Sequence, residues 1–148
     1  MTPDEVAVLA ANRAFYEAFS RGDARAMDDL WARTAPIACV HPGWDALRGR
    51  PKVMASWRAI LSGGEGPAIR CSGATAHVFG NAAYVLCYET IDDTRLIATN
   101  TFVREREAWR LVHHQAAPVA REGEDDADED EADGDPDSDL PTGGGVLN

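Results

Sequence analysis

The spacing of apolar residues changes once along this chain, at the glycine-rich segment 62–67. Before that segment, apolar residues recur every three or four positions, which is typical of amphipathic helices. After it, apolar and polar residues alternate, which is typical of half-buried strands. Helices followed by a run of strands predict an α+β fold, with the helices packed on one face of an antiparallel sheet.

The N-terminal half predicts three helices and one short strand. Thr2 and Asp23 are cap-type residues in front of the first two helices, and Gly22 between them is a typical helix stop. Pro42 and Gly43 end the short strand directly after His41. We expect helices over residues 3–20, 24–32 and 51–61, and the strand over 37–40.

Turn-type residues divide the second half into four strands. The turns fall at Gly80-Asn81, at Asp92-Asp93 and at the charged run 105–107. The expected strands cover residues 68–79, 82–91, 94–104 and 108–117. Because such short connections join antiparallel neighbours, we expect a four-stranded meander.

Negative charge is concentrated at the C-terminal end. Of 25 acidic residues, 12 lie in 122–139, so residues 1–120 carry 13 acidic and 13 basic residues and no net charge. A unit without basic excess argues against nucleic acid as a partner. We expect one folded domain over 1–120 and a disordered acidic tail over 121–148, whose removal leaves folding intact.

Cysteine usage favours a reducing compartment. Cys39, Cys71 and Cys87 lie in apolar runs without metal-ligand spacing, as expected of reduced, structural thiols. No apolar run reaches the ~18 residues of a membrane span, and the acidic N-terminus lacks the basic part of a signal peptide. We expect a cytoplasmic protein with no membrane partner.

Three short stretches resemble the nuclear transport factor 2-like superfamily, in particular its SnoaL-like and ketosteroid-isomerase-like bacterial members. They are the turn 21–23, the run 40–44 with Gly49-Arg50, and the run 109–115. The resemblance covers about residues 3–119. It implies a cone-shaped, cystatin-like fold whose curved sheet encloses an apolar cavity, and a homodimer through the outer face of the sheet.

The resemblance also implies where catalytic groups would lie. The helix tyrosine of steroid isomerases corresponds to Phe15, and neighbouring Tyr16 is expected to face elsewhere. The general-base aspartate corresponds to His41, and the second aspartate to Asn100. Two supporting tyrosines correspond to Trp31 and Trp57. Because every polar catalytic group differs in chemistry, ketosteroid isomerisation by the family mechanism is not expected.

The candidate catalytic residues are His41, His114 and Asn100. The register that the resemblance implies turns Val112 and His114 toward the cavity and His113 outward. A histidine can exchange protons near neutral pH, yet both His41 and His114 are equally compatible with structural roles. Aromatic and aliphatic side chains expected to line a ligand cavity are Phe15, Phe19, Trp31, Trp44, Trp57, Leu86, Tyr88, Phe102 and Val112.

Two function classes remain open from the sequence. The first is binding of a small apolar molecule in the cone cavity, with cofactor-independent acid–base chemistry of the isomerase or cyclase kind. The second is a non-catalytic ligand-binding or dimerisation module, because the last strand also resembles the association domain of calcium/calmodulin-dependent kinases. We expect no metal site, because the histidines lack a third ligand at a suitable spacing. We also expect no cofactor, because the sequence contains neither a phosphate loop nor a dinucleotide fingerprint. Alternating apolar residues on both faces of 82–91 independently favour a homodimer.

Overall fold

The computed structural model describes residues 1–64 and 68–120. All of its regular elements lie within the compact unit Met1–Pro118. The acidic segment expected to be disordered lies outside the described residues. In chain order the elements are α1 (Pro3–Arg21), α2 (Ala24–Leu30), β1 (Ala38–Val40), β2 (Leu47–Arg48), α3 (Arg50–Ile60), β3 (Ile69–Phe79), β4 (Ala82–Ile91), β5 (Thr94–Glu105) and β6 (Ala108–Pro118).

Local capping sets the ends of α1. The Thr2 hydroxyl accepts from the Glu5 backbone N–H at 3.1 Å, and the Glu5 carboxylate accepts from the Thr2 N–H at 2.9 Å. This reciprocal pair is a capping box. At the other end Gly22 adopts φ 67°, the left-handed conformation in which glycine closes helices at least cost.

The second helix is shorter than predicted. It ends at Leu30 because Trp31 is extended and pairs with Leu111 of β6. The Arg50 guanidinium donates to the carbonyls of Trp31 at 3.2 Å and Ala32 at 2.8 Å. Long-range contacts therefore override the helical periodicity that continued to residue 32.

The sheet has six strands in the order β2-β1-β6-β5-β4-β3. β3 to β6 form the predicted antiparallel meander, whereas β1 runs parallel to β6, with Cys39 opposite His114. The sheet is thus mixed, and the prediction of a purely antiparallel sheet is wrong. The sequence carries no local signal for this pairing, because parallel neighbours are joined through long connections.

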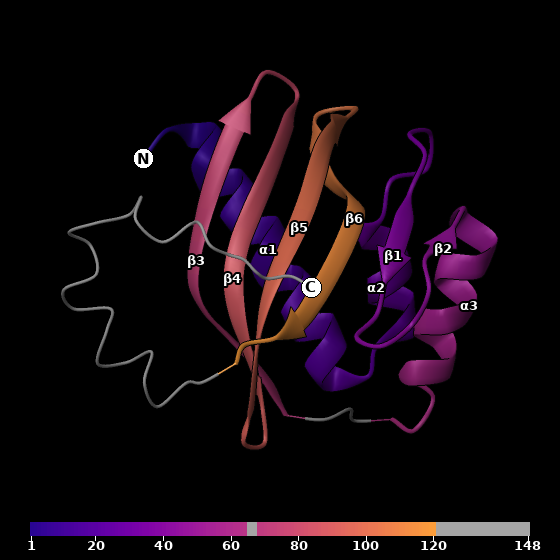
Figure 1. The fold of residues 1–148 in the computed structure, drawn as a ribbon. Helices are drawn as coiled ribbons and strands as arrows, with labels where there is room; N and C mark the ends of the chain where they lie inside the picture. Colours follow the sequence, from indigo (N-terminus) through magenta and orange to yellow (C-terminus); the bar gives the residue numbers. More distant parts are fainter. Residues whose placement is uncertain (65–67, 121–148) are drawn as a thin grey trace, which may run out of the picture. The chain divides into compact units, whose positions relative to one another are not determined.

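Helices cover one face of this sheet. Figure 1 shows α1 crossing behind β3 to β6, while α2 and α3 lie beside β1 and β2. On β4 the inward side chains are Val85, Cys87 and Glu89, and Leu86 is outward and 38% exposed. The prediction that Leu86 and Tyr88 line an internal cavity is therefore wrong, because apolar residues occupy both faces of β4 and alternation alone does not say which face is inside.

A β-bulge changes the register of β6. Thr101 pairs with His113 but Phe102 pairs with Leu111, which leaves Val112 as an extra residue. Leu111 and His114 are consequently both buried, while Val112 lies near His113 along a surface groove. The prediction that Val112 faces inward is wrong, since one inserted residue shifts the alternation by one position.

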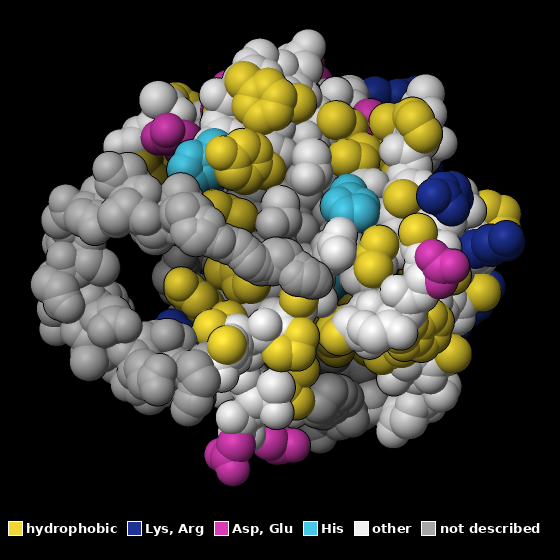
Figure 2. Space-filling view, in the orientation of Figure 1, with side chains coloured by type: hydrophobic (Ala, Val, Ile, Leu, Met, Phe, Trp, Pro, Cys, Tyr) yellow, Lys and Arg dark blue, Asp and Glu magenta, His cyan; other side chains and the backbone are white. Residues whose placement is uncertain are grey.

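The opposite face of the sheet exposes apolar side chains. Figure 2 views this face and shows hydrophobic side chains gathered over β3 and β4. Phe79 is 58% exposed at the end of β3, and the ring of Tyr84 stacks on His77 with centroids 4.7 Å apart. No helix among the described residues covers this surface, so the fold leaves one apolar sheet face open.

Candidate functional site

Two predicted residues, Asn100 and His114, meet inside the fold. They lie opposite each other on β5 and β6, and both are buried. Nδ1 of His114 lies 2.6 Å from Oδ1 of Asn100. Because the Asn100 amide nitrogen already donates elsewhere, its oxygen is the acceptor and His114 carries its proton on Nδ1.

Helix α1 extends this contact into a network. The Asn100 amide donates to Oδ1 of Asn12 at 2.8 Å and to the Tyr16 hydroxyl at 3.1 Å. The Tyr16 hydroxyl donates to Oε2 of Glu89 on β4 at 2.6 Å. Tyr16 therefore faces the interior, and the expectation that it faces elsewhere is wrong.

Three residues of this network, Asn12, Tyr16 and Glu89, are not among the site residues predicted from the sequence. Asn12 and Tyr16 lie one helical turn apart on the buried side of α1, beside Phe15. Glu89 continues the inward series Val85 and Cys87 on β4. A signal was present in both places, because a polar residue in phase with an apolar stripe is expected to be buried and partnered.

Burial favours the neutral forms of the three titratable groups in this network, Tyr16, Glu89 and His114. Loss of hydration raises the pKa of the Glu89 carboxyl, opposed in part by the hydrogen bond from Tyr16. Loss of hydration, together with nearby His41 and His113, lowers the pKa of His114 to about 3. Nε2 of His114 lies 3.9 Å from Oε2 of Glu89, and because the lowered pKa keeps His114 neutral, this contact is not an ion pair.

The third predicted catalytic residue, His41, lies in a separate environment. Its Nε2 is 2.9 Å from the Ser56 hydroxyl, and burial lowers its pKa. The Trp57 ring packs against both imidazoles, with centroids 4.9 Å from His41 and 6.0 Å from His114. His41 and His114 thus both contact the Trp57 ring, but no described hydrogen bond joins the two histidines.

The predicted ligand-lining residues divide into three groups. Phe15, Trp31, Trp57 and Phe102 are fully buried in the core, and Phe19 packs against it partly buried. Trp44 is 45% exposed and contacts His41 edge to face at 4.8 Å. Leu86, Tyr88 and Val112 lie on the outer side of the sheet.

A groove of about 520 Å³ lies between α1 and the edge strand β3. Its apolar walls include Leu9, Ile69 and Ala74. Its polar lining includes Asn12 and Tyr16, which connect it to the buried network. None of the nine predicted ligand residues borders this groove. Three of them, Phe15, Phe19 and Trp57, pack edge to face against one another instead.

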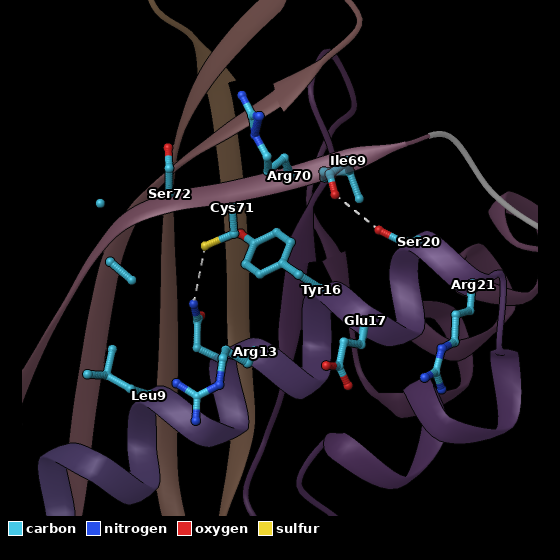
Figure 3. A pocket seen from close by; sticks show the side chains of 13 residues that line it. Leu9, Arg13, Tyr16, Glu17, Ser20, Arg21, Ile69, Arg70, Cys71 and Ser72 are labelled. Carbon is cyan, nitrogen blue, oxygen red and sulfur yellow. Dashed lines mark hydrogen bonds between the residues drawn. The ribbon is translucent and has the colours of Figure 1, made fainter.

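Figure 3 shows how this groove is built. The Cys71 side chain extends from β3 toward α1, and the Tyr16 ring lies next to it. Asn12 donates to the Cys71 sulfur at 3.7 Å, and Ser20 donates to the Ile69 carbonyl at 3.0 Å. These two contacts connect α1 to β3 across the groove.

Within residues 1–64 and 68–120, no three histidine, cysteine or acidic side chains come together in a way that could hold a metal ion. In the same part of the chain, no helix combines the length and the apolar character that crossing a bilayer requires.

Comparison with known families decides the assignment. A model of the SnoaL-like domain matches residues 8–121. The chain belongs to the SnoaL-like family. The resemblance indicated by the sequence is confirmed, and so is the cystatin-like, nuclear transport factor 2-like fold.

Solved structures similar to this SnoaL-like domain include two above 30% identity. A proposed dehydratase of the nuclear transport factor 2-like family from Streptomyces avermitilis is 34% identical, with 81% of this chain and 100% of that chain covered and a TM-score of 0.74. A proposed calcium/calmodulin-dependent protein kinase type II association domain from Thiobacillus denitrificans is 31% identical over 80% of this chain and 95% of that chain, with a TM-score of 0.64.

More distant matches carry less information. A proposed ketosteroid isomerase from Parabacteroides distasonis is 13% identical over 76% of this chain and 86% of that chain, with a TM-score of 0.62, which shows the fold alone. The F-box protein SKIP8 from Arabidopsis thaliana is 22% identical over 113 residues. These residues are 75% of this chain and 49% of that protein, so the SnoaL-like chain spans about half the length of this relative.

Proposed function

We propose that this SnoaL-like protein binds a small apolar molecule in the groove between α1 and β3 and catalyses a cofactor-independent acid–base reaction on its carbonyl group. The observation that carries the proposal is the pair formed by Tyr16, which borders the groove, and Glu89, buried behind it, with 2.6 Å between their oxygens. The 34% identical relative is a proposed dehydratase. Dehydration, isomerisation and cyclisation of carbonyl compounds can each begin with removal of a proton from the carbon next to the carbonyl group.

The roles follow from hydrogen bonding and burial. A polar group of the ligand that enters between Asn12 and Cys71 meets the Tyr16 hydroxyl. Tyr16 accepts a proton from the carbon next to the ligand's carbonyl group as it passes its own proton to the ionised form of Glu89, so the negative charge moves from Glu89 to the ligand, which becomes an enolate. The raised pKa of Glu89 suits this role, because a base whose pKa lies nearer the working pH takes up a proton more readily.

Asn100 and His114 then act as positioning residues. The Asn100 amide donates to the Tyr16 oxygen and so holds that hydroxyl toward Glu89. His114 in turn orients the Asn100 amide through the 2.6 Å contact. This assignment keeps two of the three predicted catalytic residues in the site and leaves out His41.

Hydrogen–deuterium exchange of an apolar ketone tests the proposal directly. We would incubate 2-tetralone with the protein in heavy water and follow exchange of its α-protons by NMR. We expect the wild type to accelerate exchange. Tyr16→Phe and Glu89→Gln should accelerate it about 10²-fold less, while their affinity for 2-tetralone stays within a few-fold of the wild-type affinity. His77→Gln, on the outer sheet face, is the matched control and should exchange as the wild type does.

Either of two results would contradict the proposal: no acceleration by the wild type, or equal acceleration by Tyr16→Phe. The second candidate function, a non-catalytic dimerisation module, expects the first of these results. It is favoured by the 31% identical association domain and by the open apolar sheet face. If the protein is a dimerisation module, its assembly state should depend on residues of the outer sheet face and not on residues of the groove between α1 and β3.

A further inference from the structure

Two cysteines lie side by side beneath the groove. Cys71 is on β3 and Cys87 on β4, and both side chains point to the inner face of the sheet. Cys71 is paired with Glu89, so Cys87 lies two residues along the neighbouring strand. Cys71 is half-buried and borders the groove, whereas Cys87 is buried.

The two thiols share their surroundings. Asn12 donates to the Cys71 sulfur at 3.7 Å, and the Asn100 amide lies 3.9 Å from the Cys87 sulfur. The Tyr16 hydroxyl is 3.4 Å from the same Cys87 sulfur. Each thiol is also among the groups that shift the pKa of the other, as expected of neighbouring sulfurs.

Their surroundings make the two sulfurs chemically unequal. The neighbouring Cys71 lowers the pKa of Cys87, whereas the neighbouring Cys87, together with burial, raises the pKa of Cys71. A pair in which one thiol stabilises the thiolate of the other is a recurring feature of reactive dithiols.

We propose that Cys71 and Cys87 are a redox pair that closes to an intramolecular disulfide between β3 and β4 when a two-electron thiol oxidant enters the groove. With an azodicarboxamide oxidant, the Cys71 thiol, which borders the groove, first adds to the N=N bond: its sulfur bonds to one nitrogen and its proton goes to the other. The Cys87 sulfur then attacks Cys71, and the S–N bond breaks. Two S–H bonds are lost and one S–S bond forms, while both protons and both electrons go to the azo compound, which becomes a hydrazine.

The backbone around Cys71 can accommodate this closure. Diagonal neighbours in an antiparallel pair lie ≈7–8 Å apart at Cα, slightly more than a disulfide spans, so one strand must shift. β3 is the edge strand and has a register shift between Ser72 and Thr75. Gly73 within that irregularity adopts φ 64°, which indicates a bulge rather than a rigid ladder.

Oxidation would change the groove as well as the sulfurs. Once in a disulfide, Cys71 no longer has a thiol to donate, and its sulfur moves away from Asn12 toward Cys87. The amide of Asn12 and the hydroxyl of Tyr16 then lose sulfur contacts at the groove floor. The redox state of the pair thus controls the groove, and the disulfide itself forms whether or not the proposed ligand binds there.

Thiol mapping with the third cysteine as internal control tests this pair. Cys39 is on β1, beside His41, and burial raises the pKa of its thiol to about 12. After treatment of the full chain with azodicarboxamide, we would alkylate in denaturant and map disulfides by peptide mass spectrometry. We expect a Cys71–Cys87 peptide pair, with Cys39 alone alkylated, and full recovery of all three thiols with dithiothreitol.

Serine variants sharpen the test. Cys39→Ser should form the disulfide as the wild type does, whereas Cys71→Ser and Cys87→Ser should form no intramolecular disulfide. The proposal is overturned if the wild type yields only intermolecular disulfides, pairs that contain Cys39, or no disulfide. Because the wild-type peptide map alone gives these outcomes, the test does not depend on correct folding of the Cys87→Ser variant.

Discussion

Glu89 is an acidic side chain held deep inside an apolar core. It is buried, and its described hydrogen-bond partner is the Tyr16 hydroxyl. Burying a carboxylate is costly unless it is well paired, so the folded state favours the protonated form and the pKa of Glu89 rises. The same residue that suits proton transfer therefore costs stability wherever it ionises.

The stability of Glu89→Gln relative to the wild type should depend on pH. Because the folded pKa lies above the unfolded value, the contribution of Glu89 is complete below about pH 4.5 and is lost as pH rises through the folded pKa. Gln cannot ionise and still accepts from Tyr16. We expect Glu89→Gln to gain on the wild type between pH 5 and pH 8, by at most about 1.4 kcal/mol per pH unit.

Urea unfolding of both proteins at several pH values measures this difference. His114 has the opposite sign, since its pKa of about 3 makes the fold lose stability as pH falls from about 6.5 toward 3. Both proteins contain His114, so comparing them isolates the contribution of Glu89. The prediction would be contradicted if the wild type became more stable relative to Glu89→Gln as pH rises.

The elements depend on a few backbone positions that a side chain would strain. Gly49 is the N-cap of α3 and adopts φ 91° and ψ 150°, a region essentially restricted to glycine. Its N–H donates to the Ile37 carbonyl at 2.9 Å, and its own carbonyl accepts from Val53 at 3.0 Å. One glycine therefore connects the start of α3 to the segment that leads into β1.

Gly49→Ala should destabilise the fold by about 1–3 kcal/mol, because alanine cannot adopt this conformation without strain. The strain is conformational rather than a collision, since the nearest atom to an added Cβ is Cδ of Pro51 at 3.9 Å. Gly63→Ala is the matched control, because no atom lies within 4 Å of its added Cβ. Urea unfolding should place the control within about 0.5 kcal/mol of the wild type. Equal losses in the two variants would contradict the role of Gly49.

At the scale of the whole molecule, no helix within residues 1–64 and 68–120 covers the outer face of the sheet. The helices cover the inner face of β3 to β6, while Phe79 and Leu86 remain exposed on the outer face. Apolar surface of this kind in a folded domain commonly marks an interface. A homodimer through the outer face remains a prediction.

Leu86→Glu should dissociate that dimer and leave the fold intact. A charge at the centre of an apolar interface has no partner there, whereas on a free monomer surface it is hydrated. Light scattering at micromolar concentration, with protein that ends at residue 120, reports the mass, and circular dichroism reports the fold. Glu17→Gln on α1 changes a charge at the groove instead and should remain dimeric. A monomeric wild type would contradict the prediction.

The sequence alone determined eight of the nine described elements of this SnoaL-like domain, each to within two residues at its ends, and missed the two-residue strand β2. Caps such as Thr2 and stops such as Gly22 act within a few residues, so their effects can be predicted locally. The strand over 82–91 was predicted at the same bounds for the same reason. The pairing of Asn100 with His114 was foreseen only as far as a resemblance could suggest it.

Tertiary structure alone decided which side chains meet. The bulge at Val112 reversed the alternation of β6, and the parallel pairing of β1 with β6 joins segments more than 70 residues apart. The network around Tyr16 and Glu89 draws on α1, β4, β5 and β6. Contacts between distant segments depend on strand register and packing, and a period of two along one strand leaves both undetermined.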